Sequence, residues 1–469
     1  MRINRTSLLH KNVRLWLGLT LCTLTFGLYA ANTANNVCNE SQNQGTISPC
    51  NYLQNPFGLV GYSSKGGPNG SWGLGLSGIF NNNIRPQGTD TWGIGNVVEF
   101  WGQTPRWGGF ALGGAISLAN IGSSNLLNPN DIPSQQMQHT TEVIIPNQAY
   151  LNYQYKNVFD IAAGNIVLNT PWANSAASLP PYILTNSFQG VTANLQVLPN
   201  LLLTGFGIFS YQLYPNNYWD RGTNYNIPGG IIQSIGSTPT PGSLAIGAVY
   251  QPTRNDTVNL WLYQFYNYVD MWYADNDWKL ELSKNVSMNF GIQGVMQTAN
   301  GSNLVGQQTL EGTNIPAGTP NGNAVGVKWD INVPHDTISF SYNNVFGPTG
   351  SFLNGGLITP YTYLFETDPL YTTPALGSMA ELGSGSAFTF RNKTKFLDNS
   401  LQFNVSYSVF WINKIFPTQA NLIEEYNVVL KYNIPHTKFS TLGRLVYYQQ
   451  PDYAGGNTFQ PRIIVTYVF

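Results

Sequence analysis

The stretch LQFNVSYSVFW, residues 401–411, alternates between two kinds of side chain. Every odd-numbered position is apolar or aromatic, and every even-numbered position from 402 to 408 is Gln, Asn or Ser. A two-residue period places successive side chains on opposite faces of a β-strand. Residues 286–292, 338–342 and 426–432 repeat the pattern. The sequence therefore predicts strands with one apolar face and one polar face.

The links between the expected strands are alternately short and long. Short links, mostly containing Pro, Asn, Asp or Gly, lie at 102–106, 156–158, 198–200, 251–255, 284–285, 333–336, 398–400 and 435–438. Long polar links lie at 121–147, 169–189, 212–242, 298–322 and 347–386. Such long coil segments argue against a compact soluble domain. Transmembrane antiparallel β-barrels have short turns at the periplasmic edge and long loops outside, so we predict this all-β fold.

Counting along the chain predicts about eighteen strands. They are expected near 71–80, 92–101, 107–119, 148–155, 159–168, 190–197, 201–211, 243–250, 256–265, 271–283, 286–297, 323–332, 336–345, 387–397, 401–411, 424–432, 439–448 and 460–469. An even count returns the chain to the periplasm, with every long link outside. The Gly-rich pieces at 71–80 and 107–119 fit the alternation less clearly, because Gly weakens a strand and often marks a bend.

The composition agrees with a barrel. Charged residues make up 9% of the chain and aromatic residues 13%, while the mean hydropathy is only −0.14. The sustained apolar run at 15–29 follows Arg2, Arg5, Lys11 and Arg14, and is typical of a secretory signal peptide. We therefore expect a signal peptide at 1–31, a periplasmic arm at 32–70 and the barrel at 71–469. The expected location is the outer membrane of a Gram-negative bacterium, and the net charge of −1 gives no reason to expect nucleic acid.

The sequence also suggests a disulfide near the start of the mature chain and an assembly signal at its end. Cys38 and Cys50 would meet an oxidising periplasm, where a disulfide could close the arm as a structural clip without a redox role. In the last strand, Ile463, Val465 and Tyr467 share a face with the terminal Phe469. A terminal aromatic resembles the signal read by the outer-membrane barrel-assembly machinery, although an ordinary edge strand could also end in Phe.

A barrel of sixteen to eighteen strands leaves an aqueous lumen. The link at 169–189 is the expected inward loop that narrows this lumen, and the alternative is a loop packed over the barrel mouth. Its candidate constriction residues are Asn169, Thr170, Pro171, Trp172, Tyr182 and Phe188. No Asp, Glu, Lys or Arg occurs from 161 to 219, so charge selection would come from the opposite wall.

That opposite wall carries a row of basic side chains. Phe388 and Phe390 mark a lipid face, which turns Arg391, Lys393 and Lys395 into the lumen. By the same parity Lys328, Lys431, Arg444 and Arg462 point inward, although the alternation around Arg444 is poor. Two interpretations remain: a track for anions, or wall charges neutralised by Asp330 and Glu425.

Other inward side chains are harder to place. Lys279 with Asp275, Asp277 and Glu281 forms an expected acidic counter-patch. Trp261 and Tyr263 would also point inward, so they need contacts within the lumen or a shifted strand.

Three segments stand out as motifs: Ala149-Tyr150-Leu151, the run AGNIVLNTPW at 163–172, and Ser187-Phe188-Gln189-Gly190-Val191. Together they resemble the corresponding stretch of OprD-type outer-membrane porins. The resemblance implies an eighteen-stranded barrel, monomeric or loosely trimeric, that passes small carboxylate-bearing nutrients along a ladder of basic residues. This chain has Asn165 where the family tends to have a basic residue, and it lacks the usual Asp and Arg at 173–183. A neutral or broadly tolerant pore therefore stays open.

Other functional classes are weighed against the porin. The mature chain has only His139, His335 and His436, so neither catalysis, a metal nor a cofactor is expected. The segment 32–58 is too short for the plug of an energy-coupled transporter. A surface adhesin, or a structural barrel without transport, is the open alternative. We therefore predict passive diffusion of small hydrophilic solutes with an anion bias, by a monomer or homotrimer surrounded by lipid and lipopolysaccharide.

Overall fold

The structure, a computed structural model, describes residues 70–85, 90–119, 143–156, 158–175, 184, 186–213, 217–226, 240–310, 314–362, 368–414, 421–450 and 456–468. The expected signal peptide, Cys38, Cys50, His139, Tyr182 and Phe469 lie outside these residues, so those expectations stay predictions. Within the described ranges, the structure contains no helix both long and apolar enough to cross a membrane.

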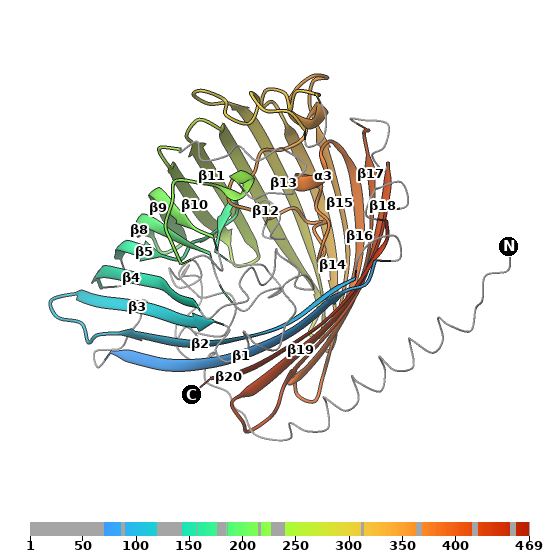
Figure 1. The fold of residues 1–469 in the computed structure, drawn as a ribbon. Helices are drawn as coiled ribbons and strands as arrows, with labels where there is room; N and C mark the ends of the chain where they lie inside the picture. Colours follow the sequence, from blue (N-terminus) through green and yellow to red (C-terminus); the bar gives the residue numbers. More distant parts are fainter. Residues whose placement is uncertain are drawn as a thin grey trace.

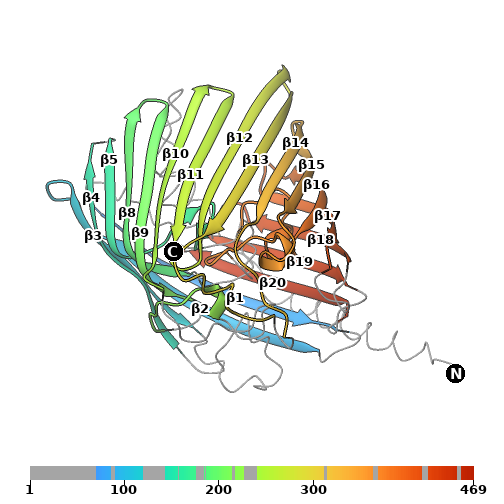
Figure 2. The same cartoon turned by 90° about the horizontal axis from the view of Figure 1, so that it is seen from above.

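Eighteen antiparallel strands form one sheet that closes on itself (Figures 1 and 2). The strands are β1 Ser71–Asn83, β2 Thr91–Gln103, β3 Phe110–Ala119, β4 Val143–Tyr155, β5 Phe159–Ile166, β8 Ser187–Leu198, β9 Leu201–Gln212, β10 Ser243–Thr253, β11 Asp256–Phe265, β12 Val269–Ser283, β13 Val286–Ala299, β14 Asn323–Asn332, β15 Asp336–Phe346, β16 Gly385–Phe396, β17 Leu401–Ile412, β18 Leu422–Asn433, β19 Phe439–Gln449 and β20 Thr458–Val468. Each strand pairs with its neighbour in sequence, and β1 pairs with β20 from Gly75↔Val468 to Asn81↔Arg462. The predicted closed barrel and its strand count are confirmed.

Most strand boundaries lie within about two residues of the prediction, and β11 and β14 match it at both ends. The predicted strand 107–119 is wrong at its start, because β3 begins at Phe110. Trp107 and Phe110 instead close a turn by exchanging two backbone hydrogen bonds of 2.9 Å. Gly108 and Gly109 supply the positive φ angles, 56° and 91°, that this turn requires.

Strand β4 begins at Val143, five residues before the predicted start at 148. Pro146 lies inside β4 and argues against a regular strand, because it has no N–H to donate to the ladder. The β3–β4 pairing shifts register there, passing from Ala115↔Gln148 to Ser117↔Ile145. This bulge accommodates the proline and lets the strand continue.

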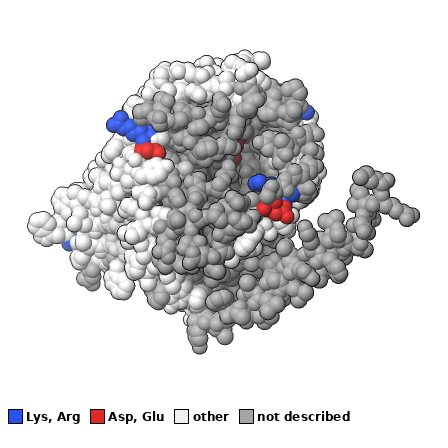
Figure 3. Space-filling model, viewed as in Figure 1, with Lys and Arg blue, Asp and Glu red and all other residues white. Residues whose placement is uncertain are grey.

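The outward face of the barrel is apolar. Leu, Ile, Val and aromatic side chains are exposed on it, and the described residues drawn in Figure 3 show few charged side chains. Aromatic rings from Trp278, Phe290, Trp329, Phe340 and Phe390 contact one another in sequence across β12 to β16. Exposed apolar and aromatic side chains on an outer barrel face are the mark of contact with lipid.

Three shorter kinds of element lie in the long links. The hairpin strands are β6 Asn169–Thr170 and β7 Ala173–Asn174, the 3₁₀ turns are η2 Asn224–Asn226 and η3 Phe352–Asn354, and the helix is α3 Met379–Leu382. In both views, α3 and the orange chain around it lie within the ring of strands (Figures 1 and 2). Part of a long link therefore lies inside the barrel.

Candidate channel lining

Two segments of the long links are fixed to the inner wall. We call residues 167–175, which include β6 and β7, the inner hairpin, and residues 368–384, which end in α3, the inner strap. The inner hairpin belongs to the link that we predicted as the constriction. The inner strap belongs to the link at 347–386, which was predicted only as a long outer link.

The inner hairpin turns at Pro171 and Trp172. The Thr170 hydroxyl donates to the Ala173 carbonyl at 2.9 Å across the turn. At the base, the Leu168 N–H donates to the Ser175 hydroxyl and the Ser175 N–H donates to the Leu168 carbonyl, at 2.9 and 2.8 Å. These bonds satisfy the backbone of the turn and present the Trp172 indole at its tip.

Trp172 is fully buried against aromatic rings of β11 and β12. Its ring meets Tyr273 edge-on with centroids 6.1 Å apart, and the backbone N–H of Trp172 donates to the Tyr263 hydroxyl at 3.3 Å. We call Trp261, Tyr263, Phe265 and Tyr273 the aromatic dock. To reach this dock from β5, the inner hairpin passes β8, β9 and β10, which lie between β5 and β11 in the sheet.

The aromatic dock provides the contacts within the lumen that Trp261 and Tyr263 were expected to need. Trp261, Tyr263 and Phe265 stack on the inner face of β11, with successive centroids 5.4 Å apart and planes within 15°. The β10–β11 register is regular over these residues, so the strand is not shifted. Gly247 faces Trp261, where an added Cβ would lie 2.4 Å from the indole. The inward rings are therefore packed inside the barrel.

Phe188 lies on β8 instead of in the loop where it was expected. Its ring meets Tyr361 edge-on at 5.4 Å, and Ala173 forms an isolated bridge with the same Tyr361. The inner hairpin therefore contacts the link at 347–386 as well as the wall. A role for Asn169, Thr170, Pro171, Trp172 and Phe188 in constriction stays a prediction.

The inner strap follows the wall from β13 to β18. The Tyr371 hydroxyl donates to the Ile292 carbonyl on β13 at 3.1 Å. The Thr372 N–H and hydroxyl both donate to Asn343 Oδ1 on β15, at 3.0 and 3.1 Å. The Thr389 hydroxyl on β16 donates to the Thr372 carbonyl at 2.9 Å. Two neighbouring strap residues are thus bound to β13, β15 and β16.

Glu425 on β18 binds the end of the inner strap. Its Oε1 accepts from the N–H groups of Ala375 and Leu376 at 2.9 and 3.0 Å, and its Oε2 accepts from Gly377 at 2.7 Å. Asn427 Nδ2 donates to the same carboxylate at 2.7 Å. Glu425 is fully buried, so these charge-assisted bonds replace its hydration.

Two titratable groups of the inner strap are perturbed. Asp368 accepts from the Leu370 N–H at 3.1 Å and the Thr373 hydroxyl at 2.8 Å, and burial raises the pKa of its carboxyl. Burial likewise raises the pKa of the Tyr371 hydroxyl, with the nearby charge of Asp277 adding to the effect. Both shifts favour the neutral form of the group.

The basic residues that were expected to point inward fall into three groups, according to the contacts that they make. Lys328 Nζ lies 2.8 Å from Asp277 Oδ1 and 4.8 Å from the centre of the Tyr371 ring. Gly291 sits between the two strands of this ion pair, where a Cβ would come within 2.9 Å of Asp277, Lys328 and Tyr371. The Arg391 guanidinium donates to the Thr373 carbonyl of the inner strap. Lys328 and Arg391 are thus used in local contacts.

Arg444 and Arg462 lie directly opposite each other on β19 and β20, and both are buried. Gln460 Oε1 accepts from Arg444 Nη2 at 3.1 Å and from Arg462 Nη2 at 2.9 Å. Arg462 Nε also donates to Asn81 Oδ1 on β1 at 2.9 Å. These two arginines join the strands where the barrel closes.

The remaining three lysines form the group that we call the lysine cluster. Lys395 and Lys431 lie in one row of the sheet, each paired with Gln402, which places their Cα atoms about 10 Å apart. The positive charge of Lys393 is repelled by those of Lys395 and Lys431. The ion pairs among the described residues are Lys328–Asp277 and Lys279–Glu281, and neither includes the cluster.

Residues of the expected acidic counter-patch also form local contacts. Lys279 Nζ pairs with Glu281 at 2.9 Å, and both side chains are about half exposed. Asp275 accepts from Asn259 Nδ2 at 2.8 Å. Among the residues in the described ranges, no group of three or more His, Cys, Asp or Glu side chains is placed to hold a metal.

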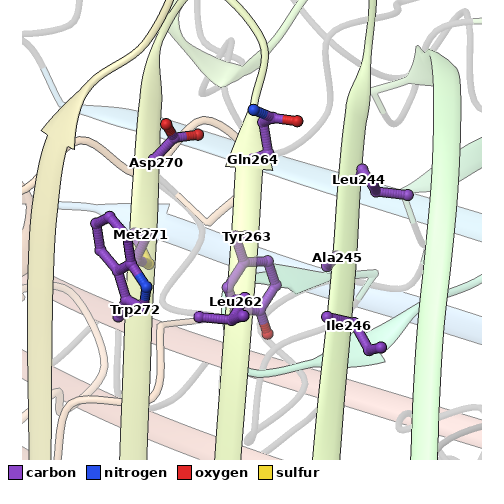
Figure 4. A pocket seen from close by; sticks show the side chains of 9 residues that line it. All are labelled: Leu244, Ala245, Ile246, Leu262, Tyr263, Gln264, Asp270, Met271 and Trp272. Atoms are coloured by element: carbon purple, nitrogen blue, oxygen red, sulfur yellow. The ribbon is translucent and has the colours of Figure 1, made fainter.

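A shallow depression of about 190 Å³ lies over β10, β11 and β12 (Figure 4). Leu244, Ile246 and Leu262 line it, and all three are exposed on the outward face. The depression therefore faces lipid and is separate from the lumen.

The fold and the apolar outer face define a class of protein, the transmembrane β-barrel. No protein-family profile matches the chain, and no curated protein sequence matches it significantly. Solved structures do match its fold. They include OccK9 (OpdG) of Pseudomonas aeruginosa, with a TM-score of 0.68 and 12% identity over 85% of this chain and 98% of that one.

Two further structures show the same likeness. OccAB3 of Acinetobacter baumannii has a TM-score of 0.68 and 14% identity, covering 85% of this chain and 99% of its own. OpdK of Pseudomonas aeruginosa, solved with vanillate, has a TM-score of 0.64 and 15% identity, covering 85% and 98%. The predicted resemblance to OprD-type porins is confirmed in the fold, and this fold is that of Gram-negative outer-membrane porins.

Proposed function

We propose that this barrel is a porin for small hydrophilic solutes and that it favours anions, including small carboxylates. The observation that carries the anion bias is the lysine cluster. Lys393, Lys395 and Lys431 share one inward face and repel one another, and no ion pair among the described residues neutralises them. A cluster of one sign in a confined aqueous passage raises the local concentration of counter-ions.

The size of the barrel supports passage. Eighteen strands enclose an interior too wide for side chains of the wall to fill, so a water-filled path is expected beside the inner hairpin and the inner strap. Diffusion along this path needs only a concentration gradient. The proposed setting is the outer membrane, with lipid and lipopolysaccharide against the apolar face and a monomer or homotrimer as the working unit.

The similar structures support the solute class. OpdK was solved with vanillate, and vanillate is a small carboxylate. A solute of that kind would be attracted by Lys393, Lys395 and Lys431. The basic residues used in local contacts, Arg391 and Lys328, would contribute less to this attraction than their number suggests.

Single-channel recording in planar lipid bilayers tests the proposal. The purified full-length protein should give discrete ohmic openings, and a salt gradient should give a reversal potential on the anion side. Correct folding would be checked by heat-modifiable migration in electrophoresis. A folded protein that leaves the bilayer silent would favour the adhesin or structural alternative.

A further inference from the structure

The inner strap is attached to the wall mainly by polar contacts that converge on a few side chains. Asn343 receives two hydrogen bonds from Thr372, while the Glu425 carboxylate binds three consecutive N–H groups of Ala375, Leu376 and Gly377. A carboxylate that accepts several backbone N–H bonds forms some of the strongest hydrogen bonds in proteins. Glu425 is therefore the strongest single attachment of this segment.

The sequence of the strap fits this attachment. An added Cβ at Gly377 would lie 3.1 Å from the rings of Phe410 and Tyr448, tighter than an ordinary contact. A glycine therefore lets the backbone come close enough for its N–H to meet Glu425 at 2.7 Å. Ser378 then caps α3, accepting from the Ala380 N–H at 3.0 Å.

We propose that Glu425 is a positioning residue, which fastens the inner strap against the wall and thereby fixes the bore beside the lysine cluster. The inference rests on the proposed channel function. Glu425 does not need to touch a solute, because it acts through the backbone of 375–377. The Glu425 carboxylate binds the backbone of the inner strap. The sequence-based interpretation, in contrast, was that it neutralises lysines or arginines.

The attachment also controls a nearby charge. The Thr373 carbonyl of the strap accepts from the Arg391 guanidinium, and Arg391 lies two residues before Lys393 on the same inward face of β16. If the strap leaves the wall, this guanidinium loses its carbonyl partner, and its charge becomes accessible to solutes beside the lysine cluster. Release of the strap therefore has two effects, an unsteady bore and a stronger anion preference.

The test compares Glu425→Gln with Glu424→Gln in the full-length protein. Both variants remove one carboxylate from β18, but Glu424 is on the outward face, where it accepts from the Tyr407 hydroxyl at 2.5 Å. In Glu425→Gln, the new amide N–H₂ would face the strap N–H groups as a second donor. We expect flickering open-channel current, a greater anion preference and amide exchange at 375–377 faster by about tenfold or more.

The outcomes separate this role from that of a simple wall charge. Glu424→Gln should keep the steady current and the slow exchange of the original protein. A greater anion preference in Glu425→Gln, with steady current and unchanged exchange at 375–377, would overturn the proposal. So would equal flickering in both variants.

A second variant covers the case in which Glu425→Gln does not fold. Asn343→Ala removes the Thr372 attachment on another strand, and should produce the same changes to a smaller degree, while unchanged exchange at 370–377 would count against the strap mechanism. Hydrogen exchange needs no conductance. If the original protein were silent in bilayers but Glu425→Gln still freed the strap, the porin proposal would fail while the positioning role of Glu425 stood.

Discussion

The inner hairpin and the inner strap are attached to the barrel wall by different forces. Trp172 places the inner hairpin in the aromatic dock, where the burial of rings supplies most of the attachment. The inner strap is held by Asn343, Arg391 and Glu425, through hydrogen bonds to its backbone. One attachment depends on apolar area and the other on charge and hydrogen-bond geometry.

The difference follows from the local composition of the wall. The chain from 161 to 219 has no charged residue, so the inner hairpin and strands β8 and β9 offer only aliphatic and aromatic side chains, hydroxyls and amides. Strands β14, β16 and β18 carry charged inward residues that can bind a backbone. A pore can thus be built with one inward segment that is insensitive to charge and another that responds to it.

The largest expected effect comes from Trp172→Ala, which removes the buried anchor of the inner hairpin. Truncating a buried aromatic costs about 3–5 kcal/mol, and here the loss falls on the attachment of residues 167–175. Hydrogen exchange of the hairpin amides should become much faster, while that of the strap at 375–377 should stay slow. Trp72→Ala, at a side chain that is 82% exposed, is the control. Unchanged exchange in the hairpin would show that the aromatic dock does not hold it.

A smaller effect is expected for Gly291→Ala. The added methyl would crowd Asp277, Lys328 and Tyr371, each within 2.9 Å of the new Cβ, and would separate the ion pair. Both charged side chains are partly exposed, so the expected loss is about 1 kcal/mol or less. Thermal unfolding in detergent measures the loss. Asp277→Asn, which breaks the pair without crowding, should give a similar decrease, and a much larger loss for Gly291→Ala would indicate a packing defect instead.

The smallest expected effect concerns the pH dependence of the inner strap. Burial raises the pKa of Asp368 above its ordinary value of 3.8, so the attached strap prefers the neutral carboxyl. The stabilisation is complete below the ordinary pKa, and is lost as the pH rises through the raised pKa. After correction for intrinsic rates, strap amides should exchange faster at high pH. Asp368→Asn should abolish the dependence, and a strap that loosened on acidification would contradict the assignment.

Much of the fold could be predicted because the strand signal is local. Side-chain alternation depends only on neighbouring residues, and it identified all eighteen barrel strands. The errors arose where local chemistry misled, at Gly108 and Gly109 in a turn and at Pro146 within a bulged strand. The inward direction of Trp261 and Tyr263 was also predicted by parity, and the structure supplied the contacts that make it possible.

The roles of the basic residues could not be predicted because their partners are distant in sequence. Arg391 binds Thr373, Lys328 pairs with Asp277, and Arg444 shares Gln460 with Arg462. Parity gives the face of a strand but not the loop that covers it. For the same reason, the binding of Glu425 to backbone N–H groups of a long link could not be predicted.

We propose above that the lysine cluster gives the channel its anion preference. The direct measurement is the reversal potential under a salt gradient for the triple variant Lys393→Gln, Lys395→Gln, Lys431→Gln, with Lys279→Gln, whose lysine pairs with Glu281, as the control. We predict that the triple variant loses the anion preference while the control keeps it. A reversal potential that is the same in the triple variant as in the original protein would contradict the account.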